Sequence, residues 1–335
     1  METDNVAQLV STGHLPGWDD VESLVQAAYR RYSLNHDGTV ADYIPVLAEI
    51  DPDLFGICVA QVDGGAVHSA GDVDTEFSIQ SISKAFVYAL VCEEFGHRTV
   101  RERIGVNNTG LPFNSVVAIE LNDGHPMNPM VNAGAIATTA LIPGATPAEQ
   151  WERIRLGLSQ FAGRPLELDG VVYQSESETN QRNRAIARLL ESYGRVEFNP
   201  LDVVDVYTKQ CALRVSACDL AVMGATLADG GVNPRTGEQV VSAQVCRDTL
   251  AILAANGLYE RSGEWLFEIG LPGKSGVTGG IVTVAPGKAG IGVFSPRLDF
   301  AGNSVRGQLV TAYLSRVLGL NIFASAAHPS QSTCE

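Results

Sequence analysis

The spacing of apolar residues near the N-terminus predicts a helix followed by a two-stranded hairpin. Over residues 18–34 the apolar positions recur with the period of a helix. The apolar runs 55–62 and 66–70 flank Gly64-Gly65, and this pair suits a two-residue hairpin turn because both positions accept a positive φ. The first helix and the first two strands are therefore expected in this part of the chain.

A second strand-rich region lies near the C-terminus. Val, Ile and Gly dominate residues 276–285 and 290–295, and Pro286-Gly287-Lys288 joins the two runs, which predicts a second hairpin. A final helix is expected over about 304–318. Strands from both ends of the chain would then form one antiparallel sheet flanked by the terminal helices.

The middle of the chain has a helical pattern. The segment that begins with Ser81-Ile82-Ser83-Lys84 continues with apolar residues on nearly every side, as in a central buried helix, and Ser81 is expected in its first turn. Further helices fit residues 115–121, 132–142, 147–161, 176–193, 200–211, 216–229 and 242–255. The pattern predicts an α+β fold in which the antiparallel sheet carries a large helical insertion. The expected parts are a discontinuous α/β sheet domain (18–84 plus 266–320), a helical domain (85–265) and flexible ends (1–14 and 324–335).

Composition narrows the possible partners and compartments. The formal net charge is −15 and no cluster of Lys or Arg interrupts it, so neither nucleic acid nor a membrane is an expected partner. Residues 1–15 lack the features of a secretory signal, and no run of about 18 apolar residues predicts a membrane span. The six cysteines form no C-x-x-C pair and the six histidines lack ligand spacing. We therefore expect free thiols in a reducing cytoplasm, no metal site and no cofactor.

Lysine is scarce in this chain, and two of the four lysines lie next to serine in two short motifs. Four of the 23 basic residues are lysines, and two of these four are Lys84 and Lys274. Ser81 and Lys84 share one face of a helix, so the amine can reach the hydroxyl and act as its base. Lysine can lose its proton when desolvated, whereas arginine cannot. By itself, S-x-x-K is more often a helix cap with a solvated lysine, but followed by Lys274-Ser275-Gly276 it is the signature of serine acyl-transfer enzymes.

These motifs predict an arrangement for acyl transfer. The positive end of the helix dipole favours an alkoxide at Ser81, which suits a nucleophile. Lys84 must be neutral to accept a proton at pH 7, so it is expected to be desolvated and near another cation, such as Lys274. Alternatively, Lys274 only holds Ser275 in place. The backbone N–H groups of Ser81 and Val277 are expected to form an oxyanion hole.

A polar segment further along the chain is a candidate for amino-acid recognition. Ser175 and Glu178 have the spacing of a capping box, which predicts a helix start. Glu176 and Asn183 are seven residues apart, or two helical turns, so both would project from one face. A carboxylate can bind the ammonium of an α-amino acid, and an amide can bind its carboxylate. The alternative is that Glu176 only favours the helix dipole while Asn183 lies on the surface.

Asn132 begins a predicted helix of small residues. Small side chains indicate tight packing around a backbone that comes close to another group. The amide of Asn132 could enter the cleft, or it could only cap the helix.

With these motifs in hand, the chain resembles the serine-dependent glutaminases, relatives of the β-lactamases that hydrolyse L-glutamine to L-glutamate and ammonia. The similarity runs from about residue 21 to residue 320. It includes the segments 41–45 (Ala-Asp-Tyr-Ile-Pro), 80–84 (Gln-Ser-Ile-Ser-Lys), 128–135 (Asn-Pro-Met-Val-Asn-Ala-Gly-Ala), 174–176 (Gln-Ser-Glu) and 270–277 (Gly-Leu-Pro-Gly-Lys-Ser-Gly-Val).

The resemblance implies a β-lactamase-like fold and assigns roles to individual residues. It implies that Ser81 is the nucleophile, Lys84 its base and Tyr259 a proton relay. The implied glutamine site consists of Tyr43, Ser81, Asn132, Glu176, Asn183, Tyr207, Tyr259 and the backbone of Val277. Because the family is generally oligomeric, the resemblance also implies a homodimer or homotetramer.

One departure from the wider superfamily bears on the alternatives. No S-x-N or Y-x-N triplet follows Ser81, so the proton relay of ordinary β-lactamases is missing. This weakens the alternative of a β-lactamase or penicillin-binding-type serine hydrolase. A catalytically inert binding protein of the same fold is disfavoured because Ser81 and Lys84 are both intact.

Overall fold

The computed structural model describes residues 14–325. The flexible ends predicted at 1–14 and 324–335 lie almost wholly outside the described residues. The prediction of an α+β fold with an antiparallel sheet flanked by the terminal helices is confirmed.

The central sheet is five-stranded and joins the two ends of the chain. Its strands are β1 (Gly56–Gln61), β2 (Val67–Gly71), β5 (Gly273–Ser275), β6 (Gly280–Ala285) and β7 (Ala289–Phe294). They lie in the order β2-β1-β7-β6-β5, with every neighbouring pair antiparallel. Both predicted hairpins are present, and Gly64 and Gly65 adopt the expected positive φ values of 73° and 64°. The first turn is longer than the predicted two residues, because Gln61 N–H donates to Ala66 O and residues 62–65 form the loop.

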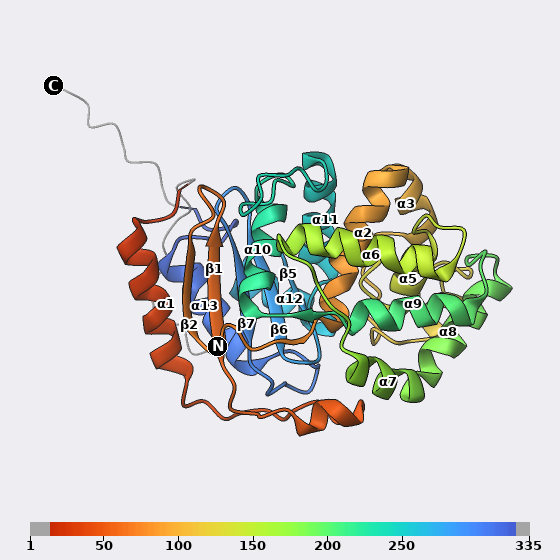
Figure 1. The fold of residues 1–335 in the computed structure, drawn as a ribbon, viewed down its shortest axis with the longest axis horizontal. Coiled ribbons are helices and arrows are strands. Elements are labelled where there is room, and N and C mark those ends of the chain that lie inside the picture. The colour runs from red at the N-terminus through yellow and green to blue at the C-terminus, as the bar shows by residue number, and fades with distance from the viewer. Residues whose placement is uncertain (1–13, 326–335) are drawn as a thin grey trace.

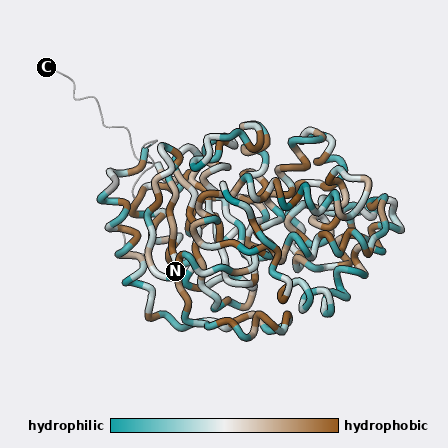
Figure 2. Tube along the Cα trace, viewed as in Figure 1, coloured by the Kyte–Doolittle hydropathy of each residue, from teal (hydrophilic) through white to brown (hydrophobic). Residues whose placement is uncertain are grey.

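Helices cover both faces of this sheet (Figure 1). The terminal helices α1 (Trp18–Tyr32) and α13 (Val305–Val317) pack on one face, where Val21 and Val310 join Ile291 in an apolar core. Hydrophobic and hydrophilic positions alternate along α1 at the left edge of Figure 2, as expected for a helix with one buried side. The sheet therefore has a core on each face.

The other face of the sheet carries α10 (Ala217–Ala228), which packs unusually close to β7. A Cβ atom built on Gly290 would lie 2.0 Å from the carbonyl oxygen of Ala221, and one on Gly292 would lie 2.0 Å from that of Ala217. Only glycine permits this approach, which explains the glycine-rich character of the predicted strand.

The remaining helices lie beside the sheet, most of them at the right of Figure 1. They are α2 (Ser83–Phe95), α3 (His97–Ile104), α4 (Val117–Glu120), α5 (Asn132–Ala140), α6 (Pro147–Ala162), α7 (Gly170–Thr179), α8 (Gln181–Ser192), α9 (Pro200–Cys211), α11 (Ala243–Asn256) and α12 (Ser262–Glu268). Of these, α11 and α12 lie next to β5. Three 3₁₀ turns are η1 (Pro45–Glu49), η2 (Gln80–Ile82) and η3 (Tyr259–Arg261), and the short strands β3 (Phe77–Ser78) and β4 (Arg214–Val215) pair with each other. Helix α2 is buried on nearly all sides, as predicted. No helix in residues 14–325 offers an apolar stretch long enough to cross a membrane.

The predicted helix over 176–193 is wrong in its start and in its continuity. The chain forms two helices, α7 and α8, which break at Asn180. Asp169, not Ser175, caps α7, because its side chain accepts hydrogen bonds from the backbone N–H groups of Val171 and Val172. The Ser175–Glu178 spacing thus falls inside a helix, where the first-turn donors of a capping box are already bonded within the helix.

Three smaller predictions also differ from the structure. Ser81 lies in η2, immediately before α2, rather than in the first turn of α2. The run 276–285 is not one strand, because 276–279 turn from β5 into β6 and only 280–285 pair with β7. The sequence pattern also did not indicate α3 or α12. The domain boundaries stay a prediction, although α10, from within 85–265, packs on the sheet.

Candidate active site

Ser81 is buried in η2, at the junction between the small sheet and helix α2. Backbone and side-chain bonds fix the segment before it: Ile79 N–H donates to Leu213 O, and the hydroxyls of Ser78 and Thr278 lie 2.9 Å apart. Gln80 has a φ of +50°, one of three positive values at non-glycine residues in the described chain. Such a conformation costs ~1–3 kcal/mol and is found where the surrounding structure holds a functional group in place.

Lys84 lies one turn beyond Ser81 and is only 1% exposed. Its Nζ donates to the carbonyl of Met130 at 3.2 Å and to Oδ1 of Asn132 at 2.7 Å. Burial lowers the pKa of Lys84 from 10.5 to about 8, with the charge of Glu176 among the opposing influences. Within residues 14–325 these two oxygens, and not Ser81, are the hydrogen-bond partners of the ammonium.

Lys274 is the second buried lysine of the site and stands on the edge strand β5. Its Nζ donates to Ser275 O at 2.7 Å and lies 4.2 Å from the centre of the Tyr259 ring. Burial lowers the pKa of Lys274 well below 10.5, and the charge of Lys84 lowers it further. The two lysines are therefore close enough for their charges to repel each other.

Tyr259 connects Lys274 with Ser81. It begins η3 with a φ of +55°, a second strained position at this site, and its hydroxyl donates to Ser275 O at 3.2 Å. Burial raises the pKa of Tyr259, and the nearby Ser81 hydroxyl opposes the rise. The phenol is therefore neutral at pH 7. Val277 packs in the same small apolar cluster as Tyr259.

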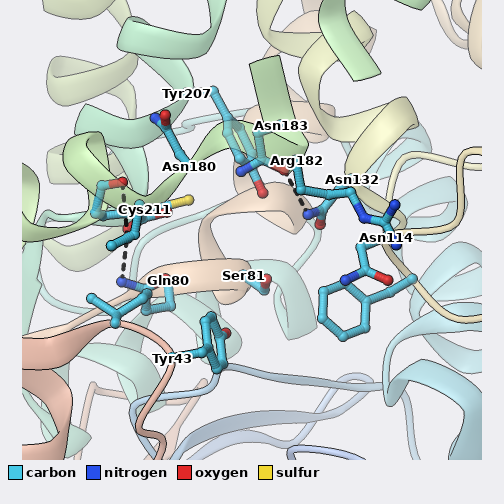
Figure 3. A pocket seen from close by; sticks show the side chains of 14 residues that line it. Tyr43, Gln80, Ser81, Asn114, Asn132, Asn180, Arg182, Asn183, Tyr207 and Cys211 are labelled. Atoms are coloured by element: carbon cyan, nitrogen blue, oxygen red, sulfur yellow. Dashed lines mark hydrogen bonds between the residues drawn. The ribbon is translucent and has the colours of Figure 1, made fainter. Parts of the chain in front are cut away.

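A pocket of about 280 Å³ opens beside Ser81 (Figure 3). Its lining consists of Tyr43, Ile44, Gln80, Ser81, Phe113, Asn114, Asn132, Glu176, Thr179, Asn180, Arg182, Asn183, Tyr207 and Cys211. Six residues that the sequence assigned to the site are among them, namely Tyr43, Ser81, Asn132, Glu176, Asn183 and Tyr207. The other three lie outside this lining: Lys84 behind Asn132, and Tyr259 and Val277 on the sheet side of Ser81.

Glu176 is a buried acid of this pocket, in the middle of α7. Burial raises the pKa of Glu176 to about 7, although a hydrogen bond from Gln80 Nε2 at 3.2 Å and the charge of Lys84 both lower it. The carboxylate therefore lacks a full counter-charge, which a cationic ligand would supply. Glu176 lies buried within α7 and not at its start, so the alternative that it only favours the helix dipole is wrong.

Hydrogen bonds link Lys84 to Asn132 and Asn132 to Asn183 along the wall of the pocket. Asn132 Nδ2 donates to Asn183 Oδ1 at 2.9 Å, while Asn132 Oδ1 accepts from Lys84. The side chain of Asn132 makes no cap bond at the start of α5. The prediction that Glu176 and Asn183 share one helix face is wrong, because Asn180 separates their helices. Both nevertheless reach the same pocket, since α7 and α8 meet at that break.

Sequence reasoning missed several lining residues, above all Asn180 and Arg182. Asn180 Nδ2 donates to Thr208 Oγ1 and its Oδ1 accepts from Arg184, so it ties the α7–α8 break to α9. The polar run Asn180-Gln181-Arg182-Asn183 was the available signal, because it interrupts a predicted helix without an apolar position. Phe113 and Asn114 stand in a loop whose sequence gives no comparable sign.

The chain is similar to glutaminases in sequence and in structure. The family model named Glutaminase matches residues 38–323. The chain is 55% identical over 336 residues to "Glutaminase 2" of Yersinia pestis, a match that covers 99% of this chain and 98% of that protein. A solved structure described as "Probable glutaminase ybaS" has a TM-score of 0.90 at 47% identity and covers 92% of this chain and all of that one. The structure of Mglu "in its glutamate form" has a TM-score of 0.86 at 40% identity, over 91% of this chain and 70% of that one.

Proposed function

The chain belongs to the glutaminase family and is an L-glutamine amidohydrolase, and we propose that it works through an acyl-enzyme on Ser81. The resemblance seen in the sequence motifs, the β-lactamase-like fold class and the enzyme class are confirmed. The observation that supports the mechanism best is the pocket in which Ser81 stands beside a buried acid, with two buried lysines of lowered pKa behind it.

The chemical steps follow from the groups around Ser81. The Ser81 oxygen attacks the side-chain amide carbon of glutamine while its proton passes to neutral Lys84, with Tyr259 as the relay. The backbone N–H groups of Ser81 and Val277 stabilise the oxyanion. The proton then moves to the leaving nitrogen, ammonia departs, and water hydrolyses the glutamyl ester to release glutamate and restore Ser81. The influence of the Ser81 hydroxyl on the pKa of Tyr259 supports the relay.

Recognition of the substrate backbone uses the polar end of the pocket. Glu176 binds the α-ammonium group, which supplies the counter-charge that the buried carboxylate lacks. Asn132, Asn183, Tyr43 and Tyr207 line the rest of the glutamine site. The glutamate form of Mglu supports an amino-acid ligand in this fold. Of the earlier alternatives, neither the β-lactamase nor the inert binding protein finds a supporting observation in this pocket.

Substitution of the two serines of the S-I-S-K motif tests the acyl-enzyme. Ser81→Ala should lower kcat by roughly four orders of magnitude or more, because nucleophile and base act as one unit. Ser83 is the matched control, since it is buried two residues away and its hydroxyl donates to Gln80 O at 2.7 Å. Ser83→Ala should lose stability but keep its activity within about tenfold of the wild type. Near-normal turnover by Ser81→Ala, or no glutamyl adduct on the acid-quenched wild type, would sink the mechanism.

We extend the proposal to assembly and location. A homodimer or homotetramer is proposed because the family that the chain belongs to is generally oligomeric, and exposed apolar residues such as Phe267 and Phe300, which are 84% and 92% exposed, are available for an interface. A cytoplasmic location is supported by five free thiols among the described residues, four of them buried. Light scattering of the purified protein should give a mass of two or four chains, and fractionated cells should hold the activity in the cytoplasm.

A further inference from the structure

Asn128 is a buried amide just before α5, and both ends of its side chain are hydrogen-bonded. Its Oδ1 accepts from the backbone N–H groups of Met130 at 3.0 Å and Val131 at 3.2 Å, which is the local turn that asparagine side chains favour. Its Nδ2 donates to the carbonyl of Asn107 at 2.8 Å and to Oδ1 of Asn256 at 3.2 Å. This side chain therefore fixes the course of the chain that leads into α5.

The same turn carries the hydrogen-bond acceptors of Lys84. Lys84 Nζ donates to the carbonyl of Met130 inside the turn and to the side chain of Asn132 directly after it. Gly134 lets α5 approach the turn closely, because a Cβ atom there would lie 1.8 Å from the carbonyl oxygen of Asn128. The orientation of the Lys84 amine therefore depends on a segment that Asn128 holds in place.

Asn256, the partner of Asn128, is the last residue of α11 and is also buried. Its Nδ2 donates to the carbonyls of Val106 and Ile252, both at 3.3 Å. These bonds fix the amide so that its Oδ1 accepts from Asn128. Both side chains of the pair are thus held from two sides.

The residues that follow Asn256 belong to the sheet side of the site. The carbonyl of Gly257 accepts from the N–H of Ser275 at 3.3 Å, and Tyr259, two residues later, donates to the carbonyl of Ser275 at 3.2 Å. The hydrogen bond between Asn128 and Asn256 therefore joins the segment that holds the acceptors of the catalytic lysine to the segment that carries the tyrosine.

We propose that Asn128 and Asn256 are positioning residues, whose hydrogen bond holds the acceptors of Lys84 and the segment of Tyr259 in their places around Ser81. The inference rests on the proposed function, in which Lys84 is the base and Tyr259 the relay. Neither asparagine is among the residues that line the pocket beside Ser81. Their loss should therefore lower kcat and leave KM almost unchanged.

Asn233, in the loop after α10, is a matched control for Asn128. It is fully buried, its Oδ1 accepts from the N–H groups of Arg235 at 2.9 Å and Thr236 at 3.1 Å, and its Nδ2 donates to two carbonyls at the end of α6, each at 2.9 Å. It makes the same two accepted and two donated bonds, outside the pocket lining. Its replacement should lower Tm about as much as that of Asn128 without an effect on catalysis.

The test compares Asn128→Ala, Asn256→Ala, the double variant and Asn233→Ala by ammonia release from glutamine, with Tm from circular dichroism. Asn128→Ala should lower kcat about 10- to 100-fold with KM within about threefold of the wild type, because small displacements of a catalytic group are costly. Asn256→Ala should lower kcat about tenfold. The double variant should lose little more than Asn128→Ala, because both substitutions break the same hydrogen bond.

The pH profile distinguishes positioning from a loss of stability. The two oxygens that accept from Lys84 favour its charged form, so releasing them in Asn128→Ala should lower the pKa of the amine. The rise of kcat/KM with pH should then occur at lower pH than in the wild type. Other titratable groups that influence Lys84 are Glu176 on α7, Cys211 on α9 and Lys274 on β5, and they are the same in every variant.

Asn128→Ser provides a rescue, because a serine hydroxyl can form the same turn more weakly. It should recover part of the kcat lost in Asn128→Ala, and together with Asn256→Ala it carries the test if Asn128→Ala does not fold. Equal effects of Asn128→Ala and Asn233→Ala on kcat, or additive losses in the double variant, would overturn the proposal. The glutamyl adduct on the acid-quenched wild type reports on Ser81 itself, so a failure of the acyl-enzyme is seen without any asparagine variant.

Discussion

Lys84 carries the most demanding part of the mechanism, because a base must be neutral when the reaction begins. At pH 7 a lysine with a pKa of about 8 is neutral in about one molecule in ten, whereas one with a pKa of 10.5 is neutral in about one in 3,000. Burial therefore raises the fraction of competent base by roughly 300-fold. Arginine cannot act as such a base, since its pKa stays above about 12 and it remains charged.

The perturbation that isolates this property is Lys84→Arg. It keeps a positive donor within reach of Asn132 and Met130, which accept the two Nζ hydrogen bonds, but it removes a base that can become neutral. We expect kcat/KM to fall by roughly four orders of magnitude, as it should for Lys84→Ala. In the wild type, kcat/KM should rise with pH through an apparent pKa of about 8.

The assay is ammonia release from glutamine between pH 5.5 and 9.5, with circular dichroism to confirm folding. Glu176, with a pKa of about 7, adds a second rise at lower pH because its ionised form binds the ammonium group. Glu176→Gln should therefore lose the lower step and keep the upper one. A folded Lys84→Arg protein with activity within tenfold of the wild type would show that Lys84 is not the base, and so would a wild-type profile that is flat between pH 7 and 9.

Three further predictions concern the pocket. Asn132→Ala should lower kcat/KM for glutamine by about 10- to 100-fold, because Lys84 loses its 2.7 Å hydrogen-bond acceptor and Asn183 loses its hydrogen-bond donor. Unchanged kinetics with a lower Tm would show that Asn132 has a structural role only. Glu176→Gln should lower kcat/KM for glutamine by about a hundredfold or more and that for N-acetylglutamine much less, and equal losses on both would show that Glu176 does not bind the amine. The pKa of Glu176 in the folded state is raised from 4.5 to about 7. As the pH rises from 4.5 to 7, the free energy of unfolding of the wild type, measured with urea, should therefore fall by up to about 3 kcal/mol relative to that of Glu176→Gln. A difference between the two proteins that does not change with pH would contradict the raised pKa.

The amino-acid sequence was enough to predict the hairpins, the buried helix α2 and the chemical groups of the site. Gly64-Gly65 and Pro286-Gly287-Lys288 mark their turns because the backbone conformations they allow are local properties. Ser81, Lys84 and Lys274 were identifiable because their motifs reflect short-range spacing and the unusual use of lysine over arginine. The pocket-lining role of Glu176 and Asn183 was also visible, although for a wrong geometric reason.

How these groups come together depends on contacts between segments that are far apart in the sequence. The break at Asn180 depends on hydrogen bonds to Thr208 and Arg184, which no local pattern records. The pKa values of Lys84 and Glu176 arise from burial by segments far away in the chain, since desolvation depends on what surrounds a group in space.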